Sequence, residues 1–156
     1  MPIRCEIVSQ DRMVYEGDVD IVVAPGEMGE MGILPNHAPL LSTLKYGILT
    51  VRKQGLAEHF TIAGGIIEVQ PDIITILADV AENVREIDIA RAEAARKRAE
   101  EFLLKGPPPD TDTYLKMEAA LKRSNLRLEA VKRYGRSQSQ RRISNPELGV
   151  EQGEYS

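Results

Sequence analysis

The stretch GGIIEVQPDIITIL, residues 64–77, decides the fold class of this chain. It holds two short runs rich in isoleucine, 66–69 and 73–77, separated by a Pro-Asp pair. β-Branched side chains fit a pleated, half-buried strand better than a helix, and Pro-Asp is typical of a turn. The stretch therefore predicts two neighbouring strands, with Gly64 and Gly65 forming a turn or a bulge before them.

Runs of the same kind occur earlier in the chain, at residues 3–8, 19–24, 48–51 and 60–63. Turn residues separate these runs at intervals of about 8–12 residues, which is the spacing typical of a sandwich or barrel. Residues 1–84 are therefore predicted to form an antiparallel β-sandwich.

The composition changes after Glu82 to Ala, Glu, Arg and Lys at helical spacing, without Gly or Pro until the GPPP at 106–109. One face of this predicted helix is rich in alanine, and Asp110 or Thr111 is suited to cap a second helix. Residues 85–134 are therefore predicted to form an α-helical hairpin, loosely docked because alanine buries little apolar area. The polar residues 135–156 are predicted to form a mobile tail. The predicted fold class is thus β + α, a sandwich followed by a hairpin.

Composition and charge exclude several classes of protein. No apolar run approaches the roughly 20 residues that span a bilayer. The net charge of −4 is uneven, since residues 1–84 hold 5 Lys and Arg against 12 Asp and Glu, whereas residues 85–156 hold 15 against 12. An acidic chain without a basic, aromatic-rich patch is a poor candidate for binding nucleic acid. The hairpin half, at +3, suits an acidic partner.

The chain has few residues of the types that commonly carry catalysis. The chain has two histidines, one cysteine and no CxxC, HExxH or GxxxxGK motif. We expect Cys5 and His59 to be ordinary strand residues, with His59 at the surface. No catalytic residue and no metal ligand is predicted, and a small hydrolase with Asp88 or Glu82 as general base is disfavoured because neither has a nearby nucleophile.

Residues 26–40 are dense in Gly and Pro and predict a shaped system of surface loops. Two interpretations of its polar residues stay open. Glu30 is either a solvated charge or a polar group that faces a partner, and His37 is either a turn residue or a second such group.

A second polar group lies at the start of the first predicted helix and on the second. Asp88 and Arg91 are one helical turn apart, as are Arg123 and Arg127. Two interpretations of these four residues stay open. Asp88 is an acid that stabilises the helix start and the arginines are solvated, or the group forms a small-anion site in which guanidinium groups bind phosphate oxygens.

Taken in order, GEMGILPNHAPL (29–40), GGIIEVQP (64–71) and the alanine-rich hairpin resemble the epsilon subunits of F-type ATP synthases, over about residues 3–134. This resemblance implies a non-catalytic subunit of the central stalk, part of the rotor, that couples ion-driven rotation of the c-ring to ATP synthesis. The sandwich would bind the gamma subunit and the c-ring, with Glu30 and His37 at that interface. The hairpin would inhibit ATP hydrolysis by extending along gamma toward the beta and alpha subunits. The implied location is peripheral, on the cytoplasmic side of the energy-transducing membrane, with membrane contact only through the complex.

Some bacterial members of this family bind ATP through an Ile/Leu-Asp-x-x-Arg-Ala motif, which here reads IDIARA at residues 87–92. For this chain, the resemblance implies that ATP is a possible regulatory ligand and that no cofactor is required. The alternative is a stand-alone ATP-responsive adaptor, which would not copurify with a gamma subunit. The nucleotide site implied by the resemblance comprises Glu82, Ile87, Asp88, Arg91, Ala92, Arg123 and Arg127.

Overall fold

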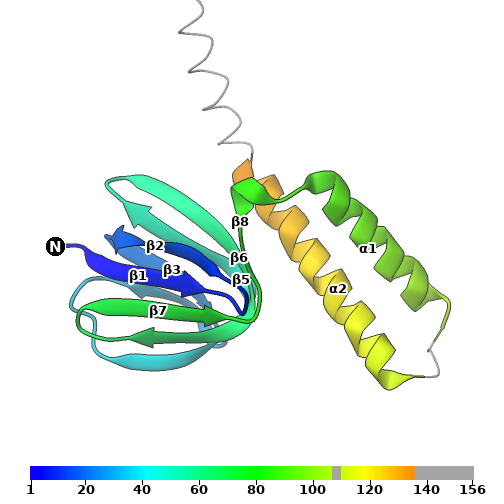
Figure 1. Cartoon of the computed structure of the whole chain (residues 1–156), viewed down its shortest axis with the longest axis horizontal. Helices are drawn as coiled ribbons and strands as arrows, with labels where there is room; N and C mark the ends of the chain where they lie inside the picture. The colour runs from blue at the N-terminus through cyan, green and yellow to red at the C-terminus, as the bar shows by residue number, and fades with distance from the viewer. Residues whose placement is uncertain (107–109, 136–156) are drawn as a thin grey trace, which may run out of the picture.

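The computed structural model describes residues 1–106 and 110–135, which form a folded β-sheet followed by a helical hairpin (Figure 1). This arrangement confirms the predicted fold class. The triple proline at 107–109 and nearly all of the predicted tail, residues 136–156, lie outside the described residues.

The described strands form one eight-stranded sheet in the order β2-β1-β7-β6-β5-β3-β4, with β8 also paired to β6. All described pairs are antiparallel except β1 with β7, so the sandwich predicted as antiparallel is mixed. Sequence patterns identify strands but not their distant partners, and β1 pairs with a strand about 70 residues later. The strands are β1 (Ile3–Val8), β2 (Met13–Val19), β3 (Ile21–Gly26), β4 (Gly29–Ile33), β5 (Leu40–Lys53), β6 (Leu56–Val69), β7 (Ile73–Ala78) and β8 (Ala81–Asn83).

The core follows from the alternation of side chains along the strands. In β1, Ile3, Cys5 and Ile7 point inward and are buried, whereas Arg4 and Glu6 are half-buried on the other face. Burial raises the pKa of the Cys5 thiol to about 12, so that this cysteine is protonated at neutral pH and packs as a small apolar residue.

Gly64 and Gly65 form neither the turn nor the bulge expected of them, because they lie inside the single long strand β6. The register with β5 is the same on both sides of the pair, from Ala63 opposite Tyr46 to Gly65 opposite Leu44. Both glycines have positive φ, +86° and +139°. They let the strand change direction without losing its pairing.

Residues 26–40, predicted as loops, contain the short strand β4, which pairs with β3. Gly29 has φ +123°, a conformation that favours glycine and allows the tight turn between these strands. The Gly-rich composition concealed the strand, because glycine is uncommon in strands in general.

Both helices begin at an aspartate whose side chain accepts a backbone N–H of the first turn. Asp88 caps α1 (Ile89–Leu104) and Asp110 caps α2 (Thr111–Ala130), as the sequence predicted for the second helix. A short 3-10 turn, η1 (Val84–Glu86), connects the sheet to α1, and a π-helical turn, η2 (Val131–Gly135), continues α2. Ala92, Ala99 and Ser124 are buried in the hairpin.

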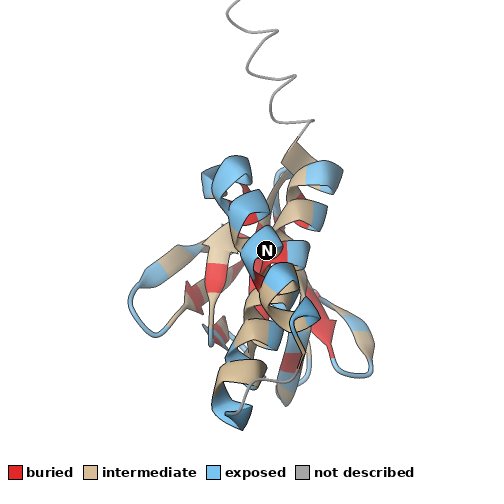
Figure 2. Cartoon of the chain, turned by 90° about the vertical axis from the view of Figure 1, so that its right-hand side faces the viewer, coloured by how far each residue is buried: buried red, intermediate tan, exposed pale blue. Residues whose placement is uncertain are grey.

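The helix α2 lies beside β5 and β6, and α1 packs on α2 (Figure 1). Large parts of both helices are exposed or half-buried, as the view from the hairpin side shows (Figure 2). The ammonium group of Lys122 lies 4.1 Å from the centre of the Tyr46 ring, which joins α2 to β5 by a polar contact. Neither helix is long and apolar enough to cross a membrane, within the described ranges.

Candidate functional site

An open cleft of about 420 Å³ lies where the hairpin joins the sheet. Residues from the end of β8, from η1 and from both helices form its walls. All but one of the predicted nucleotide-binding residues are among them. The lining residues are Glu82, Glu86, Ile87, Asp88, Arg91, Ala92, Ala95, Arg98 and Arg127.

Arg123 is the exception. It lines a much smaller recess that it shares with Thr61 and Ala63 of β6, and Glu82 and Arg127 border both spaces. Arg123 and Arg127 lie one turn apart on α2, yet the structure puts only Arg127 in the cleft.

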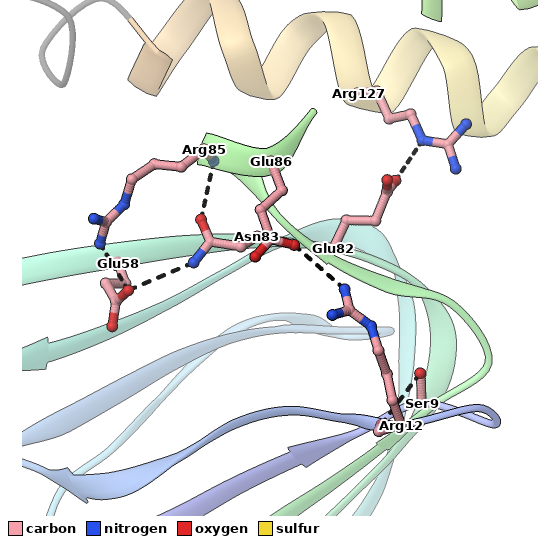
Figure 3. A network of polar contacts seen from close by, with 8 residues as sticks. All are labelled: Ser9, Arg12, Glu58, Glu82, Asn83, Arg85, Glu86 and Arg127. Atoms are coloured by element: carbon pink, nitrogen blue, oxygen red, sulfur yellow. Dashed lines mark hydrogen bonds and ion pairs between the residues drawn. The ribbon is translucent and has the colours of Figure 1, made fainter. Parts of the chain in front are cut away.

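The segment between the sheet and α1 is fastened to the sheet by ion pairs (Figure 3). The Arg85 guanidinium donates to Glu58 of β6 at 2.7 Å, and Arg12 of the β1–β2 turn lies 3.3 Å from Glu86. Exposed pairs of this kind each contribute little stability, but together they hold η1 in place on the sheet. The ion-paired part of this connection therefore ends at Glu86, immediately before Ile87 and Asp88.

A further ion pair crosses from the sheet to the hairpin. Arg127 of α2 donates from Nε to the carboxylate of Glu82 on β8, and both side chains are about seven-tenths buried (Figure 3). This contact directly holds the hairpin against the sheet, and it fixes the Glu82 carboxylate at the edge of the cleft.

Asp88 fulfils the structural role that the sequence allowed for it. Its carboxylate accepts the backbone N–H of Arg91 at 3.0 Å and thereby caps α1. The side chain of Arg91 is left exposed at the cleft.

Two arginines of α1 add positive charge to the cleft, whose lining also holds three acids, Glu82, Glu86 and Asp88. Arg91 and Arg98 are seven residues apart and so share one face of the helix. Within residues 1–106 and 110–135, neither guanidinium forms an ion pair. Ile87, Ala92 and Ala95 add an apolar wall. The cleft therefore offers donors for an anion next to an apolar surface for a flat group.

Two family models match adjacent parts of the chain. Residues 2–84 match "ATP synthase, Delta/Epsilon chain, beta-sandwich domain", and residues 85–132 match "ATP synthase, Delta/Epsilon chain, long alpha-helix domain". The chain belongs to the ATP synthase epsilon chain family.

Two relatives in this family are similar over nearly their whole length. The ATP synthase epsilon chain of Herpetosiphon aurantiacus is 44% identical over 132 residues, which cover 85% of this chain and 96% of the relative. That of Bacillus licheniformis is 43% identical over 130 residues, covering 83% and 98%. A chain of the Euglena gracilis mitochondrial ATP synthase has a TM-score of 0.64 at 27% identity, covering 78% of this chain and 76% of its own.

Membership of the epsilon family confirms the resemblance found in the sequence, including the prediction of a non-catalytic subunit. It favours a subunit of the synthase over the stand-alone adaptor. Among the described residues, no group of three or more His, Cys, Asp or Glu is arranged to hold a metal ion.

Sequence reasoning missed three residues that line the cleft of this epsilon-family chain, Glu86, Ala95 and Arg98. Helical spacing from the motif would have found two of them, because Ala95 and Arg98 lie on the same face of α1 as Ala92 and Arg91. Glu86 precedes the helix, and only its place in η1 brings it to the cleft.

The two residues implied for the ring and gamma contact lie apart from the cleft. Glu30 is exposed on β4 opposite Pro25. His37 is half-buried in the turn that follows, where its backbone N–H donates to the Leu34 carbonyl at 3.2 Å and its Nδ1 lies 2.7 Å from the Ala38 carbonyl oxygen.

Proposed function

We propose that this chain couples rotation of the c-ring to the gamma subunit in the central stalk of an F-type ATP synthase, and that its hairpin restrains ATP hydrolysis. The match of both halves to the epsilon family carries this proposal. Its place is peripheral, on the cytoplasmic side of the membrane, and its partners are gamma, the c-ring and the alpha and beta subunits. Residues 1–84 serve the rotor contact, and residues 85–134 serve regulation.

An apolar strip on the solvent face of the sheet supports the rotor contact. Ile66 and Leu77 are directly opposite each other on β6 and β7, and Leu41 lies on the same face of β5. These three side chains are 37% to 67% exposed. Exposed apolar groups that lie together are typical of protein interfaces. We assign this strip to gamma, and Glu30 and His37 to the polar part of the rotor interface.

Replacing Leu77 by aspartate is expected to weaken binding of gamma about tenfold or more, because a carboxylate would be buried without a partner in the interface. Copurification and titration with the gamma subunit measure this. The matched control is Leu56→Asp, which puts the same charge at another exposed leucine outside the strip. Equal affinity of Leu77→Asp and wild type would contradict the assignment.

The second part of the proposal is that ATP binds in the cleft and holds the hairpin docked. The cleft has walls on both sides of Ile87, where we expect the hairpin to turn away from the sheet. Glu82 and Glu86 belong to the part fastened to the sheet, whereas Arg91, Arg98 and Arg127 belong to the hairpin. A ligand that contacts both sides binds the docked hairpin more tightly than the extended one, and so shifts the population toward it. High ATP then relieves inhibition.

Calorimetric titration of the chain with ATP tests this site. We expect saturable binding that Arg91→Ala and Arg127→Ala each weaken by about 10-fold to 100-fold, since a charge-assisted hydrogen bond contributes about 1.5–3 kcal/mol. Arg123→Ala is expected to weaken binding less, because Arg123 lies in the neighbouring recess. Arg96→Ala is the matched control, because Arg96 is on α1 but pairs with Glu93 and Glu100. Absence of ATP binding to the wild type would leave the rotor contact intact and reduce Asp88 to a helix cap.

A further inference from the structure

The end of α2 is joined to the sheet by an aromatic contact that the nucleotide cleft does not include. His59 of β6 stacks on Tyr134 of η2, with ring centres 3.6 Å apart and planes inclined by 14°. The π-helical turn η2 carries Tyr134 to this position, and Gly135 ends the described part of the chain here. The sequence placed His59 at the surface of a strand; the structure shows it half-buried, because the end of α2 covers it.

A buried hydroxyl fixes the imidazole from the sheet side. Thr50 of β5 is directly opposite His59, and its Oγ1 lies 2.9 Å from the His59 Nδ1. Thr50 is only 7% exposed, so its hydroxyl depends on this hydrogen bond. The imidazole is thus held between a buried hydroxyl and an aromatic ring, one from each part of the molecule.

The surroundings of this ring disfavour a positive charge. Among the described residues, the charged groups that act on the imidazole are Arg52 of β5 and Arg133 of η2, and both are positive. Glu58, the neighbouring acid in β6, is engaged by Arg85. The Arg133 guanidinium also lies 5.2 Å from the Tyr134 ring, so this ring already faces one cation. Burial first, and then these two arginines, lower the pKa of His59 below its usual range.

We propose that His59 and Tyr134 form a proton-released clasp, which holds the end of α2 on the sheet while the imidazole is neutral and loosens when it is protonated. The clasp is a regulatory device separate from the nucleotide cleft. It rests on the proposed function only in that the hairpin must be able to leave the sheet.

The direction of the effect follows from linkage. Undocking removes Arg133 and the covering ring, and the pKa of His59 then returns toward its ordinary value of about 6.5. The docked state therefore binds fewer protons than the undocked state. Docking is at full strength above pH 6.5 and weakens as the pH falls from there through the lower pKa of the docked state. One proton is involved, so the docking equilibrium constant falls by at most about tenfold per pH unit.

Amide hydrogen exchange of the full chain between pH 7.5 and 5.5, corrected for intrinsic exchange rates, tests the clasp. Peptides from α2 and η2 report docking, and peptides from β1 and β7 report the integrity of the sheet. His59→Gln keeps a hydrogen-bonding partner for Thr50, His59→Phe keeps an aromatic ring, and neither variant titrates. Tyr134→Ala removes the stack, and Tyr134→Phe preserves it.

The expected result is that protection of α2 in the wild type and in Tyr134→Phe falls by up to about tenfold toward pH 5.5, while the sheet stays protected. In both His59 variants, protection should not change with pH. In Tyr134→Ala, it should be low throughout. A fall with pH in the His59 variants that equals the fall in the wild type would overturn the clasp alone. Hairpin protection equal to that of the sheet in every variant and at every pH would show that the hairpin does not leave the sheet. It would overturn both the clasp and the mobile hairpin, independently of the result of the ATP titration.

Discussion

Gly65→Ala is expected to destabilise the sheet by about 3–5 kcal/mol, the combined effect of a strained backbone and a steric clash with the backbone of β7. Gly65 has φ +139°, which side chains rarely allow, and a Cβ atom there would lie 2.3 Å from the Leu77 carbonyl oxygen and 2.8 Å from the Ala78 Cα. Both neighbours are backbone atoms of β7 and cannot rotate away. Urea unfolding monitored by circular dichroism measures the change in the free energy of unfolding.

The matched control separates backbone conformation from crowding. Gly55, in the β5–β6 turn, also has positive φ, +79°, but a Cβ atom there would meet nothing within 4 Å. Gly55→Ala is therefore expected to cost only about 1 kcal/mol, from its backbone conformation alone. If the two variants lose the same stability, the close approach of β6 and β7 at Gly65 is not what requires glycine.

Phe60→Ala is expected to cost about 3–5 kcal/mol, because the vacated space cannot be filled by its rigid neighbours. Phe60 is fully buried in β6, and its ring meets that of Tyr15 edge to face, with centres 5.5 Å apart. It is also opposite Asn83 of β8, next to the connection that leads to the cleft. The same urea titration measures this loss, and increased amide exchange in β8 and η1 should accompany it.

Leu56→Ala in the same strand provides the comparison. Leu56 is 65% exposed at the start of β6, so its truncation is expected to change stability by no more than about 0.5 kcal/mol. A loss below about 1 kcal/mol for Phe60→Ala would mean that the sheet relaxes around the cavity, and that the packing near β8 is softer than its burial suggests.

The sequence by itself determined much of the local structure of this chain. Isoleucine-rich runs form strands because their branched side chains suit a pleated surface, and Asp88 and Asp110 begin helices because each carboxylate accepts a nearby backbone N–H. The IDIARA motif and the family resemblance were also readable, since both depend on the order of residues along the chain.

Only the tertiary structure decided what lies next to what. Four features depend on how distant segments meet. They are the parallel pairing of β1 with β7, the continuity of β6 through two glycines, the separation of Arg123 from the cleft and the stacking of His59 on Tyr134. Such contacts depend on how the whole sheet closes and where α2 rests on it, and no short stretch of sequence contains that information. Local backbone preferences and helix caps fixed the elements, whereas strand pairing and burial shared among distant residues fixed their arrangement.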